Sequence, residues 1–244
     1  LLIPVGDLPG GATITATFVA EVGETDLDVT INGETMNAEE ALAEVEALDR
    51  HLSMYAPDSE ISWINAHAAD QPVRVGARLF GLLQLCADIS SRTSGAFDIT
   101  VAPLMRAWRE AEGPPARDAQ LCARDCVGMS GVVLDPDIRT VRFLRRGMRI
   151  DLGAIGKGYA IDRAVEVLRE HGISRALLHG GTSTIYGLGS PPGSEIWRLA
   201  LGPDPGPKVA DLRDEALSVS ASHGRYFDGA GGSFGHILDP RTGE

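Results

Sequence analysis

The sequence is poor in several features that would define a protein class. Its 244 residues include three cysteines, Cys86, Cys122 and Cys126, which are too few for a disulfide scaffold. Cys122 and Cys126 lie one helical turn apart, but no further ligands follow at matching spacing. We therefore expect small buried residues rather than metal ligands. No run of about 18 apolar residues occurs, so the sequence predicts no membrane span.

Positive charge and aromatic side chains are also scarce. The formal net charge is −12, which would repel a phosphate backbone and argues against nucleic-acid binding. Aromatic residues make up 5% of the sequence, too few to suggest a stacking platform for single strands. No basic stretch leads into an apolar run, so no secretory signal is visible. A small anionic ligand would need a local positive site or a metal ion.

The remaining composition is that of a globular protein with its own core, in which hydrophobic residues make up 43%. Strands and helices alternate irregularly, which favours an α+β fold of mixed sheets and packed helices in a single compact unit over residues 1–244. Helices are predicted after Asn37 and over 78–91, 117–126 and 157–170. Strands are predicted over 12–22, 27–31, 132–134, 140–143, 148–152, 176–178, 184–188, 217–219 and 234–238.

The densest chemical signal runs from Asp151 to Ala160, where a predicted strand leads into a predicted helix. Its glycines allow close backbone approach to a ligand. The helix start and Lys157 both favour an anion, so a pyrophosphate cradle is one interpretation. The spacing matches neither a Walker A loop nor the Rossmann fingerprint. A tight strand-to-helix turn fits the spacing equally well.

Three other clusters carry polar residues. Residues 53–65 form a polar loop in which Tyr55 could stack on a planar ring, although a capped helix start is the simpler interpretation. Residues 94–103 place Asp98 and Thr100 after a glycine that ends a helix, as an ordinary capped loop would. Residues 235–243 contain His236, which could accept a proton near neutral pH or act only as a structural donor. No Gly-x-Ser-x-Gly elbow indicates a catalytic triad.

In this order the four clusters resemble the ApbE family, the FAD:protein FMN transferases. The matching stretches are Tyr55 to Ser62, Gly95 to Val101, Ile150 to Ala160 and His236 to Gly243. The resemblance covers about residues 40–243. It implies an α+β protein that binds FAD with Mg²⁺, cleaves the pyrophosphate, attaches FMN by a phosphoester bond to a Thr or Ser hydroxyl of an acceptor protein, and releases AMP.

The resemblance also implies roles for individual residues. His236 would be the candidate base for the accepting hydroxyl, and the main-chain carbonyl of Ala154 would be one Mg²⁺ ligand. Asp151 and Lys157 would hold the cofactor near its phosphates. The full set implied to contact FAD is Tyr55, Ala96, Phe97, Asp98, Asp151, Lys157, His236 and Ile237.

The sequence departs from the family pattern in places. Gly180-Gly181-Thr182 and Val219-Ser220-Ala221 stand where Gly-Gly-Asp and Thr-Ser-Gly are usual. Family members usually continue beyond Pro-Arg-Thr-Gly into a segment that completes the Mg²⁺ site, so we expect Glu244 to precede those ligands. A flavin-binding protein without transferase activity and an FAD pyrophosphatase are therefore alternatives. The family implies the cell envelope as the compartment, although no signal peptide or lipobox is visible.

Overall fold

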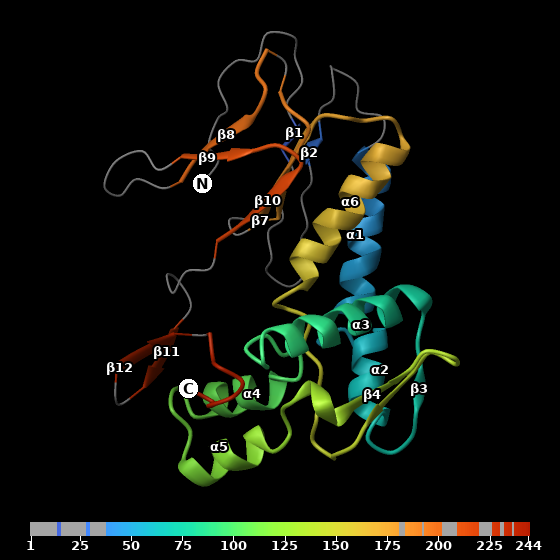
Figure 1. The fold of residues 1–244 in the computed structure, drawn as a ribbon. Helices are drawn as coiled ribbons and strands as arrows, with labels where there is room; N and C mark the ends of the chain where they lie inside the picture. The colour runs from blue at the N-terminus through green and yellow to red at the C-terminus, as the bar shows by residue number, and fades with distance from the viewer. Residues whose placement is uncertain are drawn as a thin grey trace. The chain divides into compact units, whose positions relative to one another are not determined.

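A computed structural model describes residues 14–15, 28–29, 38–180, 184–191, 193–201, 209–219, 226–229, 232–235 and 237–244. The chain divides into two compact units, a first unit of Leu1–Asp49 with Ile155–Ser220 and a second unit of Arg50–Ala154 with Ala221–Glu244. Within the described ranges, no helix is long and apolar enough to cross a membrane. A single domain over residues 1–244 stays a prediction. Figure 1 labels the helices and strands.

The core of the first unit lies between two helices and a sheet (Figure 1). Helix α1 (Ala38–Leu52) contributes Ala41 and Val45, and helix α6 (Gly156–Glu170) contributes one apolar face spaced at the helical period. Strands β6 (Ala176–Gly180), β7 (Thr184–Leu188) and β10 (Glu215–Ser218) form an antiparallel sheet in the order β10-β7-β6. A Cβ on Gly180 would lie 2.9 Å from Cδ1 of Ile161, so any side chain there would make Ile161 of α6 shift.

A second apolar cluster in the first unit forms around Trp197. Strands β8 (Trp197–Ala200) and β9 (Val209–Leu212) pair as an antiparallel hairpin. The indole of Trp197 donates a hydrogen bond from Nε1 to the carbonyl of Leu188 at 3.0 Å, which satisfies its one buried polar group. Two short strands, β1 (Ile14–Thr15) and β2 (Asp28–Val29), also pair antiparallel.

The second unit is mostly helical, with helices α2 (Glu60–His67), α3 (Ala77–Arg92), α4 (Ala102–Glu110) and α5 (Arg117–Arg124) and a short 3₁₀ turn over Met129–Gly131. Its three-stranded sheet has the order β3-β5-β4, made of Val73–Arg74, Thr140–Phe143 and Val132–Asp135. A hairpin joins β11 (Tyr226–Gly229) to β12 (Gly232–Gly235). Leu104 and Trp108 of α4 pack with Leu238 near the end of the chain.

The α+β class is confirmed, as are the helices now seen as α1, α3, α5 and α6. Three predictions are wrong. One is the strand over 234–238, since β12 ends at Gly235 and residues 237–238 belong to no strand. Residues 148–152 alternate between buried and partly exposed positions but join no sheet, because their backbone is held by other groups described below. Cys122 is exposed rather than buried, since it lies on the outer side of the polar helix α5, which has no buried residue. Helix α4 was not anticipated, because Val101-Ala-Pro-Leu gives no side-chain cap signal.

Burial separates the chemistry of the three thiols. Cys86 is 0% exposed within α3, and burial raises its pKa to about 12, so it stays protonated and unreactive.

We expect an alkylating reagent at about pH 8 to modify Cys122 quickly and Cys86 only after unfolding in denaturant. Mass spectrometry of the peptides measures this. A C86A variant should label like the wild type, and rapid native labelling of Cys86 would contradict the buried position of this face of α3.

Candidate functional site

The loop that leads into α2 presents Tyr55 to solvent. The Ser53 hydroxyl accepts hydrogen bonds from the backbone N–H groups of Tyr55 and Ala56, at 3.2 and 3.3 Å. The Ser59 hydroxyl donates to the Ser53 carbonyl at 2.5 Å and accepts from the N–H of Ser62 as the N-cap of α2. The capped helix start is therefore present. The hydroxyls fold the loop back on itself, which leaves the Tyr55 ring 59% exposed.

Asp98 fixes the second motif to the turn that precedes the 3₁₀ helix. Its Oδ1 accepts from both the N–H and the hydroxyl of Thr100, at 2.8 and 2.6 Å, and its Oδ2 accepts from the N–H of Met129 at 2.9 Å. The Thr100 hydroxyl in turn accepts from the N–H of Gly128 at 2.7 Å. Both Asp98 oxygens are thus satisfied by the protein itself. Ala96 is exposed, and Phe97 beside it is half-buried, with its N–H on the Thr93 hydroxyl at 3.1 Å.

The third motif is tied to the first and the second. The N–H of Asp151 donates to the carbonyl of Ile99 at 2.7 Å. The side-chain amide of Asn65, in α2, pairs with both backbone groups of Ile150 at 2.9 and 2.7 Å. Asp151 Oδ1 accepts from the N–H of Gly153 at 2.8 Å, which closes a short turn just before Ala154. Segments about 50 and 85 residues apart in sequence are therefore joined at one place.

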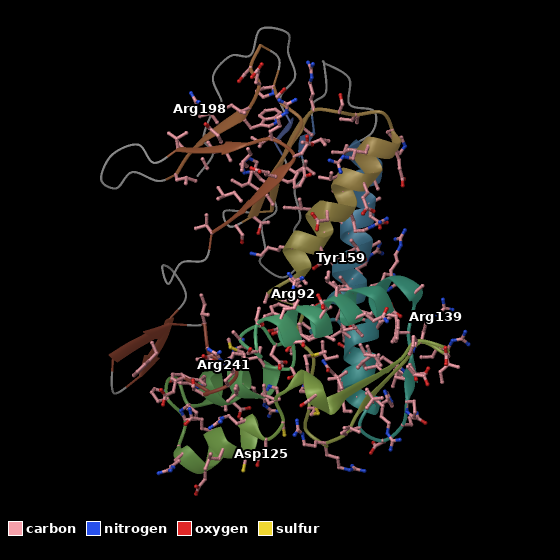
Figure 2. All side chains as sticks on the ribbon, viewed as in Figure 1. Arg92, Asp125, Arg139, Tyr159, Arg198 and Arg241 are labelled. Atoms are coloured by element: carbon pink, nitrogen blue, oxygen red, sulfur yellow. The ribbon has the colours of Figure 1, made fainter. Side chains whose placement is uncertain are left out.

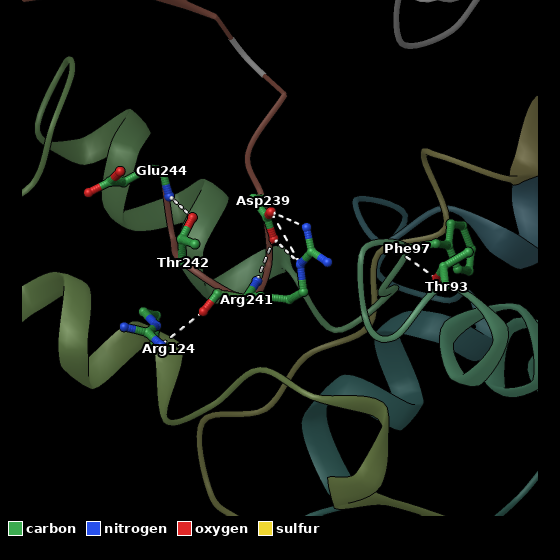
Figure 3. A network of polar contacts seen from close by, with 7 residues as sticks. All are labelled: Thr93, Phe97, Arg124, Asp239, Arg241, Thr242 and Glu244. Carbon is green, nitrogen blue, oxygen red and sulfur yellow. Dashed lines mark hydrogen bonds and ion pairs between the residues drawn. The ribbon is translucent and has the colours of Figure 1, made fainter.

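The chain ends in a tight turn that docks on α4 and α5 (Figure 3). Within the turn, Asp239 and Arg241 form a two-pronged ion pair, at 2.6 Å between Arg241 Nη2 and Asp239 Oδ2 and 2.9 Å between Nε and Oδ1. Trp108 Nε1 and Gln120 Nε2 each donate to the carbonyl of Gly243 at 2.9 Å. Arg124 donates to the carbonyl of Arg241, also at 2.9 Å. The turn beside Ile237 is thus held from both helices.

A polar cleft of about 370 Å³ opens between the second motif, α5 and the terminal turn. Its volume is at the lower end of the range for small-molecule sites. Two glycines in its wall have left-handed φ angles, Gly95 at +77° and Gly128 at +127°, which other residues rarely adopt. Arg241 and Asp125, both labelled in Figure 2, are among the residues that line it. The lining residues are Gly95, Asp98, Leu121, Arg124, Asp125, Val127, Gly128, Pro240 and Arg241.

The predicted site residues fall into three groups. Tyr55, Ala96, Phe97, Asp98, Asp151, Ala154 and Ile237 belong to the second unit, where hydrogen bonds and the cleft bring their motifs together. Lys157 belongs to the first unit, in the first turn of α6, with an exposed side chain. His236 lies outside the described residues. The pairing by Asn65 was not anticipated, since an asparagine on a helix carries no signal of its distant backbone partner.

Comparison with known proteins shows the family to which the chain is related. A family model described as "ApbE family" matches residues 11–244. The chain belongs to the ApbE family. The resemblance drawn from the four motifs is therefore confirmed.

Relatives and solved structures of the ApbE family agree with the fold. The FAD:protein FMN transferase of Klebsiella pneumoniae (strain 342) is 29% identical over 83% of this chain and 61% of its own length. One from Rhodobacter capsulatus is 34% identical over 96% of this chain and 48% of its own length. The crystal structure of the ApbE protein of Thermotoga maritima matches with a TM-score of 0.77 at 28% identity, covering 87% of this chain and 71% of that one. The apo flavinyl transferase ApbE of Pseudomonas stutzeri also gives 0.77, at 25% identity, covering 96% and 76%.

The chain spans less than two thirds of the first relatives, 61% of the one from Klebsiella pneumoniae and 62% of the one from Vibrio cholerae. What those relatives do as whole proteins is therefore a proposal for this chain.

The ion pair of the terminal turn has a measurable signature. The Arg241 guanidinium lowers the pKa of Asp239 from 3.8 to about 2, helped by backbone N–H groups. Because the native pKa of Asp239 is depressed, the contact stabilises the turn at pH values above the ordinary pKa of an aspartate. Its contribution is lost as the pH falls through about 2.

An NMR titration of the Asp239 carboxyl should show a midpoint at about 2. In R241Q the midpoint should return most of the way to the ordinary value of an aspartate. In R124Q it should stay in place, because the guanidinium that this variant removes binds a backbone carbonyl and not Asp239. An ordinary midpoint in the wild type would contradict the ion pair.

Proposed function

We propose that this chain binds FAD and transfers its FMN part to a hydroxyl of an acceptor protein, as an FAD:protein FMN transferase. The proposal is supported by family membership and by the hydrogen bonds that join motifs far apart in sequence. Asn65 ties the first motif to Ile150, and Ile99 ties the second to Asp151. The cleft adds residues of the second and fourth motifs to the same unit. Parts of all four motifs, which the sequence scatters over about 190 residues, thus belong to one compact unit.

In the proposed reaction, the oxygen of a Thr or Ser hydroxyl attacks the phosphorus on the flavin side of the pyrophosphate. The bond from that phosphorus to the bridging oxygen breaks, and AMP leaves with the bond's electron pair. The hydroxyl proton passes to a base, for which His236 is the candidate, since an imidazole can accept a proton near neutral pH. Such a transfer depends mainly on positioning and on neutralising charge.

The residues that we propose for FAD are those of the four motifs. The exposed Tyr55 side chain offers a face for a planar ring to stack on, and the exposed Ala96 and half-buried Phe97 stand in sequence between the cleft residues Gly95 and Asp98. Asp98 itself holds the local backbone, so its contribution would be to shape the site. Lys157 in the first turn of α6 supplies positive charge where the helix dipole also favours an anion. Asp151, His236 and Ile237 complete the proposed set.

The family resemblance also implies Mg²⁺, with the Ala154 carbonyl as one ligand. Octahedral Mg²⁺ prefers several hard oxygen ligands. Among the residues that the structure describes, no three His, Cys, Asp or Glu side chains gather into a metal site. The described residues do not by themselves fit the ion. Its requirement is tested by running the transfer assay with and without a chelator.

The transferase activity is tested by intact mass. We expect a Thr-containing acceptor domain, incubated with the purified protein, FAD and Mg²⁺, to gain the mass of one FMN and become covalently yellow. AMP should appear in equal amount, because each transfer releases one. An acceptor with Ala in place of its modified Thr is the matched control.

The other outcomes separate the alternatives. FMN and AMP released without a change in acceptor mass would show an FAD pyrophosphatase, in which water replaces the hydroxyl. FAD bound without turnover would show a flavin-binding protein. Either result would overturn the transferase proposal, while absence of FAD binding would overturn the whole assignment.

Removal of the positive charge at the start of α6 gives a second test. We expect Lys157→Ala to weaken FAD binding by about tenfold, because an anion at the helix start loses its counter-charge. Lys157→Arg keeps the charge and should lose less. Quenching of flavin fluorescence measures both dissociation constants. Lys208→Ala, at the only other lysine of the sequence, is the control for net charge. Equal FAD affinity in Lys157→Ala and the wild type would remove Lys157 from the site.

A further inference from the structure

Asn65 makes an unusual contact for a helical side chain. Its Nδ2 donates to the carbonyl of Ile150 at 2.9 Å, and its Oδ1 accepts from the N–H of the same residue at 2.7 Å. Both distances are those of good amide hydrogen bonds. One side chain therefore satisfies both backbone groups of Ile150, as a neighbouring strand would otherwise do.

Among the residues that the structure describes, the segment that Asn65 holds has few other backbone hydrogen bonds. Residues 148–152 join no sheet, although Met148, Ile150 and Leu152 are buried and Arg149 and Asp151 are partly exposed. The next backbone bond is the N–H of Asp151 on the carbonyl of Ile99, at 2.7 Å. Asn65 and Ile99 thus fix two successive residues, and the second of them is Asp151.

The carboxylate of Asp151 is oriented by the short turn that it forms with Gly153, and only one of its two oxygens takes part in that turn. Its Oδ1 accepts from the N–H of Gly153 at 2.8 Å. Its Oδ2 has no hydrogen-bond partner among the described residues, so it can accept from a bound ligand. The direction of that oxygen depends on the backbone at Ile150 and Asp151, which is the backbone that Asn65 pairs.

We propose that Asn65 is a positioning residue, which sets the backbone at Ile150 so that the Asp151 carboxylate meets FAD in the productive orientation. This rests on the proposed function, in which Asp151 contacts FAD. Only an amide of this length supplies a donor and an acceptor together at one backbone position. Aspartate keeps the acceptor and loses the donor, and alanine loses both.

The test is a double-mutant cycle on FAD affinity, with Asn65→Ala, Asp151→Ala and the double variant. Flavin fluorescence quenching is measured well below each melting temperature. We expect Asn65→Ala to weaken FAD binding at least about fivefold in the wild-type background and less than about twofold in the Asp151→Ala background, because the effect passes through Asp151. Asn65→Asp should lie between Asn65→Ala and the wild type.

Two further measurements separate positioning from lost stability. Hydrogen exchange at the Ile150 amide should accelerate in Asn65→Ala and stay slow in Asn65→Asp, which keeps the acceptor. Trp197→Phe removes a comparable side-chain-to-backbone bond in the first unit. It should lower the melting temperature and leave the affinity for FAD unchanged.

The proposal is overturned if Asn65→Ala binds FAD as tightly as the wild type, or if its loss of affinity is the same with and without the Asp151 carboxylate. An equal loss of affinity in Trp197→Phe would also overturn it, because general destabilisation would then explain the effect. A wild-type protein that binds no FAD is a different result, since it rejects the proposed function itself.

Discussion

The backbone at Ile150 and Asp151 is the place on which the organisation of the second unit depends. A carbonyl from the second motif pairs with Asp151, and a side-chain amide from the first motif pairs with Ile150. Buried backbone groups must find partners, and Ile150 is 0% exposed. Without a sheet to join, this segment takes its partners from two motifs that lie elsewhere in the sequence. The need to satisfy one buried stretch of backbone thereby brings three motifs to one locality.

The position of the terminal turn also depends on the need of buried polar groups for partners. Trp108 is 5% exposed, and its indole N–H needs an acceptor, which the Gly243 carbonyl provides. Gln120 and Arg124 add two more donors to carbonyls of the turn. The Asp239–Arg241 ion pair closes the turn internally, but it is exposed and contributes geometry more than stability. Side-chain donors on α4 and α5 therefore fix the end of the fourth motif, at Arg241 and Gly243.

Sequence patterns predicted helices and hairpins well where the residues that form the pattern also stabilise the element, as a buried apolar stripe or a turn aspartate does. Helices α3 and α6 each bury a stripe spaced at the helical period, and the hairpin of β4 and β5 turns at Asp135, whose side chain accepts from the N–H of Asp137. Residues 148–152 alternate as a strand does, but alternation reports burial on one side and not the source of the hydrogen bonds. Helix α4 escaped prediction because Pro103 near its start is also common in loops.

The candidate site was predictable as a set of motifs and not as a geometry. Asp151 and Asp98 look alike in sequence, each followed two residues later by a small residue. Both carboxylate oxygens of Asp98 accept hydrogen bonds, from Thr100 and Met129, while only one oxygen of Asp151 accepts a hydrogen bond, from Gly153. The distinction depends on which backbone N–H groups the fold brings near, and no local pattern encodes it.

Charge imposes a further constraint on how such a site can work. The chain carries −12, so an anionic cofactor meets an unfavourable average field. The two arginines on the cleft are already engaged, Arg241 with Asp239 and Arg124 with a backbone carbonyl. An arginine held by a carboxylate offers little net positive charge to a phosphate. Arg124 keeps its positive charge on the cleft, because a carbonyl partner does not neutralise a guanidinium. Backbone N–H groups act as dipoles and favour an anion only at close approach, which glycines such as Gly95 and Gly128 in the cleft wall permit.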